Sequence, residues 1–249
     1  MAGLAELHSV YELYNEIWRP DPTNPPITTE LLRALTKAGN YVSGAFDGDI
    51  LVGACVGFFG TPSHTMMHSH VAGVSAAAMG RSVGFALKLH QRAWAISRGL
   101  SSIAWTFDPL VSRNAYFNLA KLGATPTEYL PNFYGGMHDA INGSDESDRL
   151  LVRWDLRELK MGGSQNRGDA VVALDRSAAG LPVLGSLDAS NLVVAVPRDI
   201  EALRTADPDG ARQWRAAARE VLGALLAEGA RVTGYDRAGW YLVTRKDTA

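Results

Sequence analysis

The stretch from Val71 to Lys88 constrains the fold most strongly. An apolar strand that ends near Val74 leads into a turn of small residues, Ser75 to Ser82, and a helix begins at Val83. Backbone N–H groups and the positive end of the helix dipole meet at such a junction, which is where a phosphate group binds. The pattern therefore predicts a cradle for a nucleotide-bearing ligand.

Periodicity predicts a mixed α/β chain. Apolar residues recur every three or four positions in residues 4–18, which is typical of an amphipathic helix. The turn Asp47-Gly48-Asp49 predicts a hairpin. The expected helices cover 4–18, 29–38, 83–97 and 113–122. The expected strands cover 41–46, 50–59, 65–74, 102–107, 125–130 and 150–156.

The composition changes after Leu156. A Gly-, Ser- and polar-rich segment at 161–167 predicts a linker between a domain of residues 1–160 and a C-terminal extension of residues 168–249. Trp240 and Tyr241 on the last expected strand suit either core packing or a contact in a homodimer. The elements expected in the extension are strands at 169–174 and 192–197, a helix at 207–228 and a closing hairpin at 231–245.

Charge and composition narrow the class of protein. The formal net charge of the 249 residues is −2 and the basic residues are scattered, so no nucleic-acid partner is expected. No apolar run is long enough for a membrane span, and charges in the first twenty residues exclude a signal-peptide core. By elimination we expect a cytoplasmic protein. Its single Cys55 lies in an apolar run, which predicts a buried, inert thiol.

A set of motifs follows the order of elements described above: Trp105-Thr106-Phe107-Asp108-Pro109-Leu110, Asn114-Ala115, Asn118 to Ala124, Tyr134-Gly135 and Asp148-Arg149. The order of elements resembles that of the GNAT superfamily of acyl-CoA-dependent N-acyltransferases, and the motifs are similar to those of a bacterial branch of predicted acetyltransferases. The resemblance covers residues 4–156 most clearly. It implies a mixed, mostly antiparallel sheet flanked by helices, with acetyl-CoA or another acyl-CoA as cosubstrate.

In that superfamily the turn and helix hold the pyrophosphate of coenzyme A, and the strand before them binds the pantetheine arm. Two registers of the family motif compete here, one over Met79–Gly84 and one that uses Arg81, Gly84 and Ala86. We favour the first, because it keeps Leu87 and Lys88 where the helix faces the core. The phosphate contacts come mainly from backbone amides, so Ser82 is tolerated at a glycine position if its φ stays negative. The cofactor-binding residues implied are Val71, Gly73, Val74, Gly80, Arg81, Ser82, Val83, Gly84, Ala86 and Asn114.

The general acid departs from the family pattern. Many members place a Tyr four residues before the Gly of the second short helix, and Leu119 occupies that position here. Either coenzyme A leaves as the thiolate, or another group donates the proton. Tyr116, nearly one turn earlier, is the substitute, and its alternative role is packing.

Histidines and an aspartate are candidates for the base that deprotonates the amine. His68 and His70 share one face of their strand because side chains alternate with a period of two. Asp108 ends the next strand, where it equally suits a turn cap before Pro109. His64, His68 and His70 also suggest a zinc site, but no carboxylate or Cys completes that set, so no metal is expected.

The long loop 131–149 offers groups for recognising the substrate. Arg149 suits a clamp on a carboxylate, and equally a surface ion pair with Asp145 or Asp148. Asn114 and Asn118 are four residues apart and should share a helix face. One could contact coenzyme A and the other the acceptor, or both could be solvated amides on the helix surface. The other polar residues in this set are Asn132, Tyr134 and Asn142.

We therefore expect transfer of an acyl group, acetyl by default and succinyl as a second choice, to the amine of a small molecule such as an amino acid. The transfer needs no covalent intermediate, and the sequence has no convincing nucleophile triad. A second hypothesis is a catalytically silent acyl-CoA sensor or partner subunit, motivated by Leu119, Ser82 and Met79. A third, a Rossmann-type nucleotide enzyme, conflicts with the hairpin before the cradle.

Overall fold

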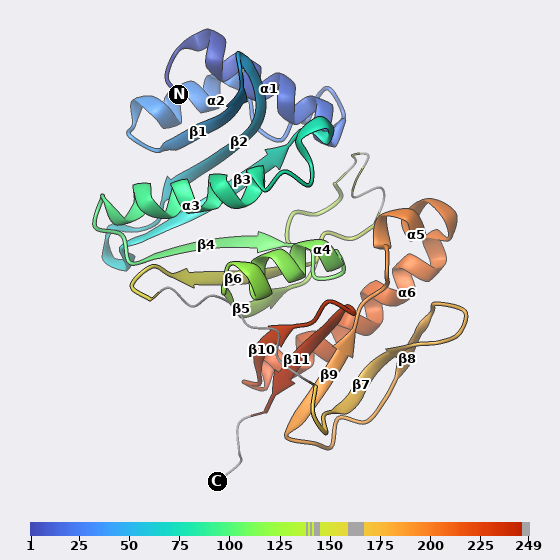
Figure 1. Ribbon diagram of the computed structural model, residues 1–249. Helices are drawn as coiled ribbons and strands as arrows, with labels where there is room; N and C mark the ends of the chain where they lie inside the picture. Colours follow the sequence, from blue (N-terminus) through green and yellow to red (C-terminus); the bar gives the residue numbers. More distant parts are fainter. Residues whose placement is uncertain (138, 140, 142–144, 159–166, 246–249) are drawn as a thin grey trace. The chain divides into compact units, whose positions relative to one another are not determined.

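Antiparallel strands and the helices that cover them build the first part of the chain (Figure 1). Strands β1, β2 and β3 follow one another in antiparallel pairs, and β4 joins β3 in parallel. The strands are β1 (Tyr41–Asp47), β2 (Ile50–Phe59), β3 (Met66–Val74) and β4 (Ser102–Phe107). The helices are α1 (Leu4–Trp18), α2 (Thr29–Lys37), α3 (Val83–Ile96) and the short 3₁₀ turns η1 (Pro62–His64) and η2 (Ala76–Ala78).

The computed structural model describes residues 1–137, 139, 141, 145–158 and 167–245, which form two compact units. The first unit contains residues 1–105, 139, 141 and 155–157, and the second contains the other described residues. The division between these units falls within β4, after Trp105. The linker expected over 161–167 stays a prediction. Residues 159–166 lie outside the described residues.

Side-chain alternation on β2 gives the first unit two packed faces. Ala54 and Val56 pack with Leu7, Val10 and Tyr14 of α1. On the other face, a Cβ on Gly53 would meet Val83 and Leu87 of α3, so this glycine allows the helix to approach the strand closely. The expected hairpin turn is present, with Gly48 at a φ of +61°.

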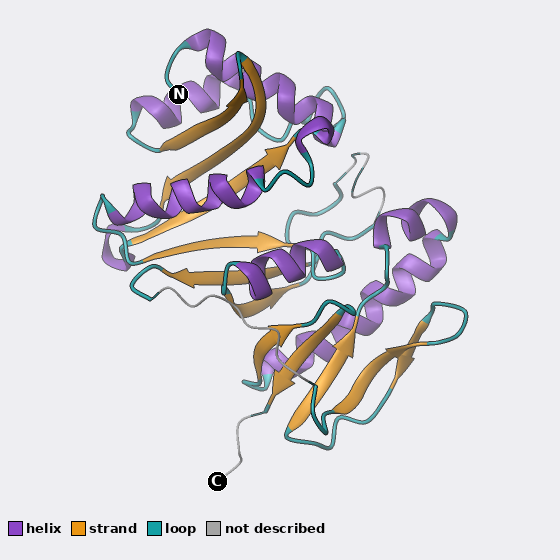
Figure 2. Cartoon of the chain, viewed as in Figure 1, coloured by secondary structure: helices purple, strands orange, loops and turns teal. Residues whose placement is uncertain are grey.

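The second unit contains a separate five-stranded sheet in the order β10-β11-β9-β7-β8, with only the β7–β9 pair parallel. Figure 2 shows its helices in purple beside the strands in orange. The strands of this sheet are β7 (Val171–Arg176), β8 (Pro182–Leu184), β9 (Asn191–Ala195), β10 (Arg231–Tyr235) and β11 (Trp240–Thr244). Outside it, β5 (Thr125–Leu130) and β6 (Arg149–Asp155) form an antiparallel pair. The helices are α4 (Ser112–Ala115), η3 (Tyr116–Lys121), α5 (Ile200–Ala206), α6 (Pro208–Ala218), η4 (Arg219–Gly223) and α7 (Ala224–Ala227).

The mixed α/β class with mostly antiparallel sheets is confirmed. Strand β8 and helix α5 were not expected from the sequence, because a three-residue strand that begins with proline carries little periodicity. The helix expected over 113–122 begins as α4 and continues as the π-helical turn η3. Trp240 and Tyr241 are 7% and 0% exposed, so they pack in the core of the second unit and form no surface for a homodimer.

Within the described residues, no helix is both long and apolar enough to cross a membrane.

Gly185 is a test of the packing in the second unit. A Cβ on Gly185 would overlap the carbonyl oxygen of Val172 on the neighbouring strand, and backbone cannot move aside cheaply. Gly185→Ala should therefore lower the free energy of unfolding by about 1–3 kcal/mol in urea titrations. The control Gly223→Ala, in a helix where the added methyl meets Tyr129 at an ordinary 3.5 Å, should leave it unchanged or raise it. Equal losses in both variants would contradict this account.

Candidate functional site

The junction between β3 and α3 has the geometry of an anion cradle. The Ser75 N–H donates to the Val52 carbonyl at 2.9 Å and ends β3, and a turn with two left-handed residues follows. These are Gly80 at a φ of +79° and Ser82 at +62°. Ser82 does not meet the condition of a negative φ, because the chain needs a second left-handed residue to turn into α3. For a residue with a Cβ this costs roughly 1–2 kcal/mol.

The first turn of α3 presents free donors. The Ala86 N–H donates to the Ser82 carbonyl at 3.0 Å, and the N–H groups of Val83, Gly84 and Phe85 come before it. Those first-turn groups have no acceptor within the helix. The turn carries no acidic side chain, so nothing there opposes an anion.

Arg81 beside the cradle is already paired. Its guanidinium lies 2.7 Å from the Asp47 carboxylate in the β1–β2 turn, and both side chains are more than half exposed. Val83, Gly84 and Ala86 lie within α3, whereas Gly80, Arg81 and Ser82 lie in the turn. The candidate residues thus divide into helix amides and turn residues.

The strand β3 leaves much of one edge unpaired. Its parallel pairing with β4 joins only Met66–His68 to Ser102–Ala104. Residues 69–74 continue along β2 alone among the described strands of this unit, so no described strand pairs with their outer backbone groups. A register shift opposite Val56 and Gly57 leaves His70 without a paired residue on β2. Such a bulge turns a strand away from its neighbour.

Val71 and Gly73 on this strand also have packing roles. The Tyr14 hydroxyl of α1 donates to the Val71 carbonyl at 3.3 Å. A Cβ on Gly73 would lie 2.8 Å from both Ile17 and Trp18, so glycine lets α1 reach the sheet. Val74 ends the strand, and its side chain would lie 3.7 Å from a Cβ placed on Gly84 across the junction.

His68 and His70 lie together on β3. Their ring centroids are 6.4 Å apart, and Phe58 lies 5.2 Å from His68 and 5.8 Å from His70. Desolvation lowers the pKa of His68 to about 4, helped by the charges of His70 and Lys88, and it also lowers the pKa of His70. Both rings are therefore uncharged near neutral pH and can accept a proton. Among the described residues, no three His, Cys, Asp or Glu side chains are grouped to hold a metal ion.

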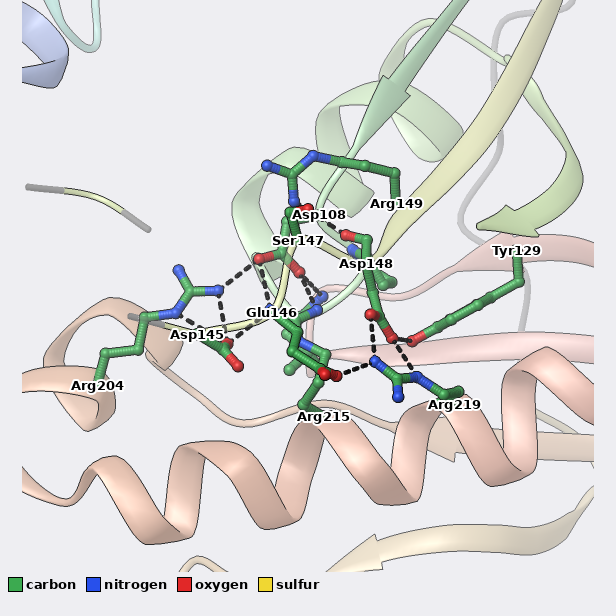
Figure 3. A network of polar contacts seen from close by, with 12 residues as sticks. Asp108, Tyr129, Asp145, Glu146, Ser147, Asp148, Arg149, Arg204, Arg215 and Arg219 are labelled. Carbon is green, nitrogen blue, oxygen red and sulfur yellow. Dashed lines mark hydrogen bonds and ion pairs between the residues drawn. The ribbon is translucent and has the colours of Figure 1, made fainter. Parts of the chain in front are cut away.

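In the second unit, Asp108 lies in a buried ion network (Figure 3). Its carboxylate accepts two hydrogen bonds from Arg215 at 2.8 Å, one from Arg204 at 2.5 Å and one from the Leu110 N–H at 2.9 Å. Burial raises the pKa of Asp108, but the guanidinium groups of Arg215 and Arg204 outweigh it and hold the pKa far below its usual range. Asp108 is therefore a poor proton acceptor, and the geometry corrects its assignment as a base.

The same network joins the extension to the loop before β6. Asp145 pairs with Arg204 and Arg215, and Asp148 accepts hydrogen bonds from Arg219 and from the Tyr129 hydroxyl. Three guanidinium groups of the extension thus face three buried carboxylates of the segments before it. The sequence interpretation missed these arginines, although Arg215 stands on the apolar face of the predicted helix beside Trp214.

Arg149 is buried rather than on the surface. Only 7% of it is exposed, so the alternative of a surface ion pair is wrong. Its guanidinium donates to the Asp148 carbonyl at 2.9 Å, contacts Met137 Sδ and lies 5.4 Å from the centre of the Tyr134 ring. The Tyr134 hydroxyl in turn lies 3.0 Å from Thr106 Oγ1. Arg149 and Tyr134 are therefore neighbours, as their placement around the loop suggested.

The α4–η3 helix carries the remaining candidates. The Arg237 Nε donates to the Tyr116 hydroxyl at 2.9 Å, which ties this residue to the β10–β11 turn. Asn118 is buried and Asn114 is half-buried, so they are not two equivalent solvated amides. Leu119 is also buried. Asn132 accepts from the Ser147 N–H at 3.2 Å, and Asn142 lies outside the described residues.

Comparison with known proteins identifies the fold. The sequence matches no family profile and no curated protein. Its structure matches an N-acetyltransferase from Staphylococcus aureus Mu50 with a TM-score of 0.52 and 15% identity, over 62% of this chain and 95% of that one. The chain has the GNAT N-acetyltransferase fold.

Two further GNAT-type structures are similar. An inferred acetyltransferase of the GNAT family from Desulfovibrio desulfuricans matches with a TM-score of 0.51 and 13% identity, over 63% of this chain and 96% of that one. A proposed acetyltransferase from Salmonella typhimurium, solved with its cofactor acetyl-CoA, matches with a TM-score of 0.51 and 17% identity, over 63% and 92%. Each match leaves more than a third of this chain uncovered.

Arg215 tests whether the ion network holds the second unit together. Arg215→Met should lower the free energy of unfolding by about 3–5 kcal/mol, because it leaves Asp108 and Asp145 buried with too little positive charge. Denaturant titration measures the loss. The control Arg212→Met, on the same helix but with 59% of its side chain exposed and paired to the exposed Asp209, should change stability by less than about 1 kcal/mol. Similar losses in both variants would contradict the account.

Proposed function

We propose that this protein is an acyl-CoA-dependent N-acyltransferase. It moves an acetyl or other short acyl group, such as succinyl, from acyl-CoA to the amine of a small molecule. The observation that carries the proposal is the sequence of free donors along one path, the unpaired edge of β3 followed by the first-turn amides of α3. A ligand with an extended amide-bearing arm and a diphosphate fits this path.

The α3 amides bind the diphosphate in this proposal. The N–H groups of Val83, Gly84 and Phe85 donate to its oxygens, and the helix dipole adds favourable electrostatics. The edge of β3 over residues 69–74 pairs with the amides of the pantetheine arm as an added strand would. Gly80 and Ser82 shape the turn, and Arg81 supplies positive charge nearby.

His70 is the proposed base. It is exposed, whereas its neighbour His68 is half-buried between Phe58 and the strand. The neutral imidazole takes a proton from the amine as the nitrogen attacks the thioester carbonyl. The C–N bond forms, the C–S bond breaks, and coenzyme A leaves with the electron pair of that bond as a thiolate. A backbone N–H at the His70 bulge stabilises the oxyanion.

Arg149 and Tyr134 remain the proposed acceptor-binding residues. Arg149 and Tyr134 form a neighbouring cation and aromatic ring, which suit a carboxylate and an apolar body such as those of an amino acid. Asn118 and Asn114 add amide groups on α4–η3. Tyr116 remains the proposed proton donor to the leaving thiolate, and its hydroxyl already bonds Arg237.

A silent acyl-CoA sensor is the second candidate, because the buried Leu119 occupies the place of the family's tyrosine. Incubation with acetyl-CoA or succinyl-CoA and a panel of amines, followed by measurement of thiol release, distinguishes the enzyme from the sensor. Thiol release with any amine supports the enzyme. Binding in calorimetry without thiol release across the panel would favour the sensor.

Gly84→Asp is the sharpest test of the cradle. A carboxylate in the first turn favours the helix, and the new Cβ would lie an unstrained 3.7 Å from Val74, so the stability should rise or stay constant. The negative charge should nevertheless weaken acyl-CoA binding at least 10-fold in calorimetry. The control Gly84→Asn has nearly the same size and no charge, so its loss should be clearly smaller. Unchanged affinity in Gly84→Asp would contradict the cradle.

His70→Gln tests the base. The turnover number should fall roughly 100-fold while the KM for acyl-CoA stays constant, because the base acts on the amine. The wild-type rate should decline as the pH falls through a pKa below the usual 6.5 of histidine, since protonation removes the base. The control His64→Gln changes an exposed histidine of the same unit and should have no effect. Full activity in His70→Gln would exclude this role.

A further inference from the structure

Lys88 is a buried cation inside the first unit. It lies on α3 in the stripe of sheet-facing residues that also includes Leu87 and Gln91, and only 5% of it is exposed. Its Nζ donates to Ser69 Oγ at 2.8 Å and to Gln91 Oε1 at 3.2 Å, and it lies 4.0 Å from the centre of the Trp105 ring. The ammonium is thus held by neutral groups.

No carboxylate pairs with Lys88 among the residues that the structure describes. Burial lowers the pKa of Lys88 to about 8, so the group is still mostly protonated at neutral pH. A buried charge without an opposite charge is costly, and an apolar side chain of similar length would avoid that cost. The positive charge therefore calls for an explanation other than packing.

The position of this charge supplies one. Ser69, which accepts from Lys88, lies between His68 and His70 in the sequence of β3, at the register shift of the strand. The two histidine rings lie on the side of β3 opposite to Ser69, because side chains alternate. The ammonium consequently stands directly behind the backbone that carries both rings. Its charge is one of the causes that lower the pKa of His68.

We propose that Lys88 is a positioning residue of the acyl-transfer step, which rests on the proposed function. Its ammonium, fixed against the back of β3 by Ser69, adds to the desolvation that keeps the neighbouring His68 uncharged. It also places positive potential behind the bulge, where the thioester oxygen gains negative charge. A fixed charge in a dry environment acts there without reorganisation during the reaction.

Other titratable groups face this region from the packed elements. They are His68 and His70 of β3, Cys55 of β2, Tyr41 of β1 and Tyr14 of α1. Burial raises the pKa values of Cys55, Tyr41 and Tyr14, so these groups are neutral at pH 7. Lys88 therefore supplies the fixed charge in this set.

Lys88→Met in the full chain is the experiment. NMR titration of the histidine ring protons should show the pKa of His68 rising toward its usual value, because the cation behind it is gone. The turnover number should fall about 10-fold with a constant KM for acyl-CoA, because the positive potential behind the bulge is removed. The melting temperature should stay constant or rise. The control Lys37→Met removes the same charge from an exposed site of α2 and should change none of these.

An unchanged His68 titration together with an unchanged turnover number would overturn the proposal and leave Lys88 as a packing residue. If Lys88→Met does not fold, Ser69→Ala retains the charge but releases its anchor, and it should move the His68 titration in the same direction by less. No movement in that variant would overturn the proposal as well. The NMR readout needs no turnover, so it separates failure of this inference from failure of acyl transfer, which the thiol-release assay detects.

Discussion

The short parallel pairing between β3 and β4 is the constraint on which the candidate site depends. Because the pairing joins only Met66–His68 to Ser102–Ala104, no described strand pairs with the outer edge of the remaining length of β3. That edge leads through the left-handed turn at Gly80 and Ser82 to the first-turn amides of α3. Had the two strands paired along their full length, their hydrogen bonds would have used the donors that a pantetheine arm requires.

Charges have different physical roles in the two units. Around Asp108 in the second unit, carboxylates and guanidinium groups are matched, so burial is offset by ion pairs and the side chains are held in fixed geometry. In the first unit, Lys88 has hydrogen-bond partners without negative charge. Paired charges hold side chains in a fixed geometry, whereas an unpaired buried charge changes the electrostatic potential at neighbouring groups. Asp108, held by two guanidinium groups, is therefore a poor base, whereas the unpaired charge of Lys88 can act on the groups of the proposed reaction.

Much of the fold could be predicted from local patterns. The boundaries of α1, of β2 and of the hairpin β10–β11 follow from periodicity and turn residues, each of which acts over a few positions. The side of α3 that faces the sheet, with Leu87 and Lys88, follows from the same reasoning. The partners of Asp108 could not be predicted, because Arg204 and Arg215 lie 96 and 107 positions away in the sequence. The positive φ of Ser82 could not be predicted either, because it depends on how the turn closes onto α3.

The sequence by itself determined the order and limits of most helices and strands, the small-residue turn before α3 and the pair of histidines on one face of β3. Those features depend on side-chain alternation, helical period and turn propensity, which are local properties. Only the tertiary structure decided which charges are paired, which are buried and where β3 parts from β4. These outcomes depend on distances between segments remote in the chain, and it is those distances, together with burial, that set the pKa of each group.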